Sequence, residues 1–120
     1  MHIASIGIDL GKTTFHLVAL GERNKVLVRK KFSRTQLLSY TANLPASLIG
    51  LEACAGAHFM GARLREQGHK VRLIPAQFVK PYRKSNKNDF IDGEAMAEAV
   101  LKENMTARPV SRLLNPATMM

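Results

Sequence analysis

The sequence predicts an α/β fold built on one mixed β-sheet, in which three antiparallel strands are followed by parallel ones. The first observation is a series of three short apolar runs near the N-terminus, at residues 3–9, 14–20 and 25–32. The turns between them, Gly11-Lys12 and residues 21–24, are too short for a crossover connection. An antiparallel meander is therefore expected for the first quarter of the chain.

The second observation is an alternation of strand and helix patterns in the middle of the chain. Apolar runs at 47–53 and 70–74 flank a helical pattern at 56–67, which Gly68 is expected to end. A passage from strand to helix to strand implies a parallel strand pair with a right-handed crossover. The residues of this helix predicted to face the core are Phe59, Ala62 and Leu64.

Three further segments complete the predicted elements. Ser33 is a suitable N-cap for a helix that ends near Leu44-Pro45. Residues 75–82 predict a short helix broken at Pro81, and residues 89–104 predict a longer one. Residues 106–120 show no convincing period. We therefore expect one domain at 1–105 and a tail or linker at 106–120.

Composition restricts the class of protein. The chain has 120 residues, and its 46% apolar content is typical of a globular domain. No apolar run reaches the roughly 20 residues that a membrane helix needs, and the first strand begins too early for a signal peptide. The single cysteine, Cys54, is expected to be a small buried residue and suits a reducing cytoplasm. The net charge of +9 favours polyanionic partners, nucleic acid first among them.

Two carboxylates lie at the ends of predicted strands. Asp9 ends the first strand, and Glu52 lies near the end of the strand at 47–53. By the two-residue period of a strand, Asp9 shares its face with Ser5 and Gly7, and small residues there leave room for a ligand or metal. Glu52 has Gly50 on its own face. Burying a carboxylate is costly unless it is paired or binds a metal, so both positions are candidates for a site.

A second pair of acids begins the predicted helix at 89–104. Asp89 and Asp92 are three residues apart, and so lie on one face of its first turn. If this helix packs across the small-residue face of the sheet, the four acids Asp9, Glu52, Asp89 and Asp92 meet. Hard oxygen ligands select Mg²⁺ or Mn²⁺, and two such ions can act on one scissile phosphate. Taken singly, each acid has an equally good structural explanation. Asp9 could start a turn, Glu52 could accept from a backbone amide, Asp89 could start the helix, and Asp92 could be a solvated side chain of its first turn.

Basic residues gather just before this helix. The candidates for contact with nucleic acid are Lys12, Lys80, Tyr82, Arg83, Lys84 and Lys87. Tyr82 offers an aromatic face among cations, which suits a base and its phosphates. A solvated basic loop explains the same pattern equally well.

The residues singled out above resemble the DEDD transposases of the insertion-sequence-110 family, relatives of the Piv DNA invertase, over roughly residues 6–109. The matching stretches are Ile6-Gly7-Ile8-Asp9 with Lys12, Leu51-Glu52-Ala53-Cys54 with Gly56 and His58, Val79-Lys80, and Lys87-Asn88-Asp89-Phe90-Ile91-Asp92-Gly93-Glu94-Ala95. The resemblance implies a RuvC-like fold of the ribonuclease-H type, with the four family acids on Asp9, Glu52, Asp89 and Asp92.

The resemblance also implies a function and partners. It implies recombination of insertion-sequence DNA, guided by a structured bridge RNA, by a protein that assembles into dimers or larger complexes. The family has a second, C-terminal domain that supplies a nucleophilic serine, and nothing around Ser111 matches it. We therefore expect this chain to be the N-terminal domain alone and unable to complete transposition by itself.

Two alternatives stay open at this point. The chain could be a module that holds DNA or RNA and cuts nothing. The stretch Asp9-Leu10-Gly11-Lys12-Thr13 is also similar to the first phosphate loop of sugar kinases and actin-like ATPases. Against that second alternative, such proteins need two domains of this kind, and Asp89 and Asp92 have no obvious part in them.

Overall fold

The computed structural model describes residues 2–11, 13–82 and 90–114, and for residues 103–114 it gives the helical backbone only. Within these residues, five strands form one sheet in the order β3-β2-β1-β4-β5. The elements are β1 (Ser5–Leu10), β2 (Phe15–Leu20), η1 (Glu22–Asn24), β3 (Val26–Phe32), α1 (Arg34–Ala42), β4 (Leu48–Glu52), α2 (Ala57–Glu66), β5 (Lys70–Ile74), α3 (Ala76–Val79), η2 (Lys80–Tyr82) and α4 (Ile91–Leu114).

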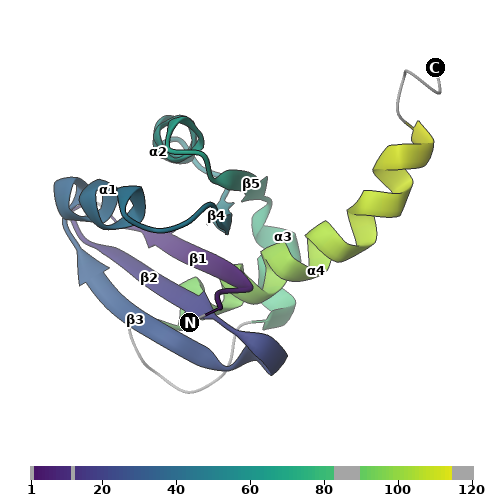
Figure 1. The fold of residues 1–120 in the computed structure, drawn as a ribbon, viewed down its shortest axis with the longest axis horizontal. Coiled ribbons are helices and arrows are strands. Elements are labelled where there is room, and N and C mark those ends of the chain that lie inside the picture. Colours follow the sequence, from purple (N-terminus) through teal and green to yellow (C-terminus); the bar gives the residue numbers. More distant parts are fainter. Residues whose placement is uncertain (1, 12, 83–89, 115–120) are drawn as a thin grey trace.

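The sheet has the predicted mixture of strand directions (Figure 1). β1 pairs antiparallel with β2, and β2 pairs antiparallel with β3. On its other side β1 pairs parallel with β4, which in turn pairs parallel with β5. The α/β fold class, with antiparallel strands first and parallel strands after, is therefore confirmed. It is the arrangement expected of a ribonuclease-H-type domain.

Helices cover the sheet on both faces (Figure 1). On one face, Ile6 and Ile8 of β1 share a buried core with Leu37 of α1 and Leu64 of α2. On the other face, α4 packs across the strands, and Met96 with its neighbours forms a second buried core. The two-residue period of β1 separates these cores, since successive side chains point to opposite faces.

The small residues of β1 make room for a helix and not for a ligand. A Cβ atom added at Gly7 would overlap the carbonyl oxygen of Gly93 and would lie 2.8 Å from the Cβ of Met96. Ser5, two residues earlier, donates a 2.7 Å hydrogen bond from Oγ to the carbonyl oxygen of Ala97. The expectation of open space beside Ser5 and Gly7 was therefore wrong, because the backbone of α4 fills it.

The helices on the opposite face are held by local signals, some of which were misread. Ser33 caps α1 as predicted and forms a reciprocal capping box with Gln36. The buried stripe of α2 passes through Met60 and Leu64, whereas Phe59 and Ala62 are exposed. Those two core predictions were wrong because the apolar face advances by three and four residues, which leaves Phe59 to one side. Gly68 ends the segment at a φ of 99°, as predicted.

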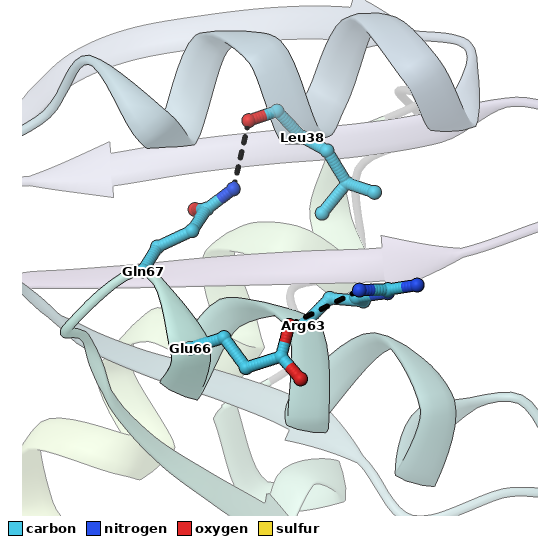
Figure 2. A network of polar contacts seen from close by, with 4 residues as sticks. All are labelled: Leu38, Arg63, Glu66 and Gln67. Carbon is cyan, nitrogen blue, oxygen red and sulfur yellow. Dashed lines mark hydrogen bonds and ion pairs between the residues drawn. The ribbon is translucent and has the colours of Figure 1, made fainter.

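Polar contacts join these two helices to each other and to the sheet. The Gln67 side chain donates from Nε2 to the carbonyl oxygen of Leu38 over 2.9 Å (Figure 2). Buried His69 accepts from the Ser47 amide at Nδ1 over 3.1 Å. Its Nε2 atom lies 2.9 Å from the carbonyl oxygen of Thr41, so the ring donates there. One side chain thus ties the end of α1 to the strand segment that follows it.

The last helix is longer than predicted. The helix begins at Ile91 and its backbone continues to Leu114, through the segment in which no period was visible. Its C-terminal part extends beyond the sheet (Figure 1). The boundary predicted at residue 105, between a domain and a tail, remains a prediction.

A search for membrane-spanning segments found none among the helices of the described residues, because each is too short or too polar.

Candidate carboxylate site

Two of the four predicted acids lie at the tips of neighbouring strands. In the parallel pair of β1 and β4, Ile8 lies opposite Leu51, and Asp9 and Glu52 are the next residue on each strand. Both side chains are half-buried. Both face the α4 side, because Gly7 and Gly50, two residues earlier on each strand, approach that helix.

The first turn of α4 brings a third acid towards the ends of these two strands. Gly93 lies against Gly7, and Ala97, one turn later, lies against Ser5. The helix therefore runs back along β1, and its N-terminal end points toward the tip that carries Asp9. Asp92 lies in this first turn and is half-buried. A carboxylate there is favoured by the positive end of the helix dipole.

The close packing at Gly7 sets this geometry. A glycine on the strand and a glycine on the helix allow the two backbones to touch, so the first turn cannot slide along the strand without losing the fit. Asp92 directly precedes the glycine at the contact point. The contact thus positions a helix-borne acid relative to two strand-borne ones.

The described residues do not close these acids into a metal-binding cluster. Among residues 2–11, 13–82 and 90–102, no three His, Cys, Asp or Glu side chains are grouped so that they could hold an ion. The fourth predicted acid, Asp89, lies outside the described residues. The donor set nevertheless suits a hard divalent cation, because every member is a carboxylate.

Sequence reasoning missed His16 as a neighbour of this site. In the antiparallel register of β1 and β2, His16 lies directly opposite Asp9. Its ring meets the Phe90 ring edge to face, with centroids 5.2 Å apart. The register could have revealed it, since a hairpin that pairs Leu10 with Phe15 must pair Asp9 with His16.

The predicted nucleic-acid residues are only partly described. Lys80 is exposed in η2, and Tyr82 is half-buried against the core that contains Ile74 and Met96. Part of the tyrosine ring is therefore used in packing. The others, Lys12, Arg83, Lys84 and Lys87, lie outside the described residues.

Comparison with known proteins identifies the family of the chain. A family model for IS110-type DEDD proteins, described as a transposase, matches residues 6–116. The chain is 46% identical over 117 residues to the "Transposase for insertion sequence element IS1328" of Yersinia enterocolitica, covering 98% of this chain and 33% of that protein. It is 41% identical over 110 residues to a "Probable family 20 transposase" of Pseudomonas aeruginosa, covering 92% and 32%.

A third relative extends the same result. The "Transposase for insertion sequence element IS1111A" of Coxiella burnetii is 38% identical over 103 residues, covering 86% of this chain and 28% of that protein. The chain thus spans about a third of the length of the curated relatives that it matches.

Proposed function

Since the chain belongs to the IS110 family of DEDD transposases, we propose that it is the part of a DNA transposase that engages DNA and supports metal-dependent phosphodiester chemistry. One observation carries the proposal. Asp9, the last residue but one of β1, and Glu52, the last of β4, lie on the face crossed by the first turn of α4, which holds Asp92. Residues far apart in the sequence thereby meet at the C-terminal ends of two neighbouring strands.

In this proposal Asp9, Glu52 and Asp92, together with Asp89, hold Mg²⁺ or Mn²⁺. When bound, such ions polarise a phosphoryl oxygen and stabilise the charge that develops on the leaving oxygen. The carboxylates position the ions, and the neighbouring helix N-terminus reduces the repulsion between like charges. The α4 backbone packed on Gly7 holds the turn that carries Asp92 in place against β1.

The partner of this site is DNA, bound first through its phosphates. The net charge of +9 attracts the polyanion, and exposed Lys80 in η2 is a described contact candidate. A structured guide RNA and a second copy of the chain are further partners in the proposal. Strand exchange as a whole is proposed for the complete protein, because this chain spans about a third of its relatives.

A non-catalytic nucleic-acid-binding module is the second candidate. It is favoured by the absence, among the described residues, of three metal-ligating side chains in one cluster. Both candidates bind nucleic acid through a basic surface. Only the enzyme needs the acids for its activity.

The test compares Asp9→Asn with wild type in two assays. Cleavage of a branched DNA substrate is followed during titration with Mg²⁺ or Mn²⁺, and DNA binding is followed in EDTA. We expect metal-dependent cleavage by wild type, its loss in the variant, and unchanged or slightly tighter binding, because one negative charge is removed. Glu22→Gln, at an exposed acid in η1, is the matched control and should cleave like wild type.

Binding without any metal-dependent cleavage would favour the module over the enzyme. A purified chain that recombines insertion-sequence ends unaided would contradict the proposal that strand exchange needs more of the sequence that its relatives have.

A further inference from the structure

An exposed aromatic ring flanked by two arginines lies on the face of the sheet opposite α4. Phe59, in the first turn of α2, is 49% exposed, which is unusual for a large apolar side chain. The guanidinium carbons of Arg34 and Arg63 lie 5.4 Å and 5.5 Å from the centre of its ring. These contacts join the start of α1 to α2 through a solvent-facing cation–π group.

The two guanidinium groups remain available for other contacts. The Arg63 side chain is 52% exposed and forms a 3.1 Å ion pair with Glu66, which is itself 66% exposed (Figure 2). Such surface pairs contribute little stability and exchange readily with solvent. Arg34 is also exposed. Both cations can therefore turn to a phosphate without disrupting the core.

A small cavity opens beside the ring. Its volume is about 190 Å³, and it is lined by Leu10, Gly11, Phe15, Arg34, Cys54, Gly56, Phe59 and Met60. Cys54, expected to be buried, is exposed here. The cavity is smaller than the pockets of roughly 300–1,000 Å³ that hold complete small-molecule ligands. Its apolar lining and one flanking arginine suit a single planar ring attached to an anion.

The cavity and the carboxylate site lie on two sides of the same strand tip. Asp9 faces α4, whereas Leu10, the next residue, faces the opposite core and lines the cavity. A polynucleotide strand that passes over the tip of β1 could thus present a phosphate to one side and a base to the other.

We propose that Phe59, Arg34 and Arg63 bind an unpaired nucleotide of a DNA strand, with the base on the Phe59 ring and the flanking phosphates on the two arginines. The inference rests on the proposed function, since it assigns a binding surface to the same partner. Charge complementarity supports a nucleic-acid occupant, because the ring is bordered by two cations in a chain of net charge +9. An unpaired base is required because bases in a duplex do not expose their faces for stacking.

The absence of tryptophan from the chain allows a direct test. Phe59→Trp introduces a single indole at the proposed stacking position. We expect its fluorescence to be quenched by a 20-nucleotide oligo-dT in EDTA and to be unchanged by an abasic oligomer of equal length and charge. Phe78→Trp, at a ring in α3 that is 55% exposed, lies two residues from the proposed DNA contact Lys80 and reports DNA bound there. Oligo-dT and the abasic oligomer should therefore quench it alike.

Affinity measurements complete the test. Phe59→Leu should weaken binding of oligo-dT about tenfold, within the range for loss of one stacked base, and should leave binding of the matching duplex nearly unchanged. Arg34→Gln should weaken binding of oligo-dT and of the abasic oligomer alike. Thermal unfolding of each variant confirms that the half-exposed substitution leaves the fold intact.

Several results would overturn the proposal. These are equal quenching of the Phe59→Trp variant by abasic and oligo-dT strands, tighter binding of oligo-U than of oligo-dT, or burial of its indole by a second copy in the absence of DNA. Because the measurements use EDTA, they are independent of the carboxylates. Asp9→Asn should bind oligo-dT at least as tightly as wild type, so failure of the metal proposal and failure of this one are distinguishable.

Discussion

One face of the sheet is packed by side chains and the other partly by backbone. Towards α1 and α2, Ile6 and Ile8 are fully buried against leucines of both helices. Towards α4, Gly7 lets the backbone of the helix touch the strand itself. Side chains can adjust their rotamers to a changed neighbour, whereas a backbone contact has no such freedom. The face that carries the acids is therefore the less tolerant of change at its contact point.

This difference has a functional consequence. The acids of the candidate site come from separate elements, so their relative positions depend on how α4 lies on the sheet. A contact between Gly7 and Gly93 fixes that position without relying on a flexible side chain. The opposite face carries its exposed ring and arginines on α1 and α2, where small displacements of a long side chain do little harm.

The largest effect is expected from Gly7→Ala. The added methyl group would overlap the carbonyl oxygen of Gly93 and crowd Met96, so α4 must move away from β1. We expect a loss of about 3 kcal/mol or more in the free energy of unfolding, at or above the upper end for overpacked cores. Urea unfolding followed by circular dichroism measures it.

Gly56→Ala is the matched control for that change. Gly56 has a φ of −79°, and among the described residues no atom outside its own neighbours lies within 4 Å of the position that its Cβ would take. An alanine there should leave stability within about 0.5 kcal/mol of wild type, as for most surface substitutions. Equal destabilisation by both alanines would contradict the view that backbone contact makes the α4 face special.

The same contrast explains what the sequence could and could not predict. The antiparallel meander and the parallel pair of β4 and β5 followed from local patterns, because alternation and turn length are properties of neighbouring residues. The pairing of β1 with β4 joins distant segments and could only be assumed. The parity of Asp9 with Gly7, and of Glu52 with Gly50, correctly placed both acids on one face. The small residues beside Asp9 were predicted to leave room for a ligand or metal, and the backbone of α4 occupies that room. A glycine predicts space but does not predict what fills it.

Two other features needed three-dimensional information. Phe59 is an apolar residue in a helix, and Arg63 lies one turn later on the same side of that helix. Only the position of α1 shows that Arg34 meets the ring as well. His16 carries no motif, and its place beside Asp9 follows from strand register. The distances that decide whether the acids share a cation depend on packing between elements, which no local pattern contains.

A smaller effect is expected at the polar junction on the α1 and α2 face. His69→Ala removes a 4% exposed ring and leaves the Ser47 amide without the partner it has in wild type. The Thr41 carbonyl loses one donor and keeps its bond from the Leu44 amide. We expect a loss of about 2 kcal/mol in the free energy of unfolding, within the range for a buried polar group left unsatisfied. Hydrogen exchange should show faster exchange at the Ser47 amide specifically.

His2→Ala, at an exposed histidine before β1, removes an imidazole that is not buried. It is the control and should leave the free energy of unfolding unchanged. If the Ser47 amide exchanges no faster in His69→Ala than in wild type, then the His69 ring does not hold Ser47 to the end of α1.

The smallest effect is expected at the N-cap of α1, which also carries Arg34. Ser33→Ala removes the 3.3 Å bond that the Gln36 amide donates to the Ser33 hydroxyl, and it breaks half of the capping box. The expected loss is about 1 kcal/mol, typical of an N-cap serine. Ser39→Ala, at an exposed serine within the same helix, should be neutral or slightly stabilising. If the start of α1 frays in Ser33→Ala, Arg34 leaves the Phe59 ring, and binding of oligo-dT should weaken along with the loss of stability. Unchanged binding in a measurably frayed helix would show that Arg34 does not contribute to the surface around Phe59.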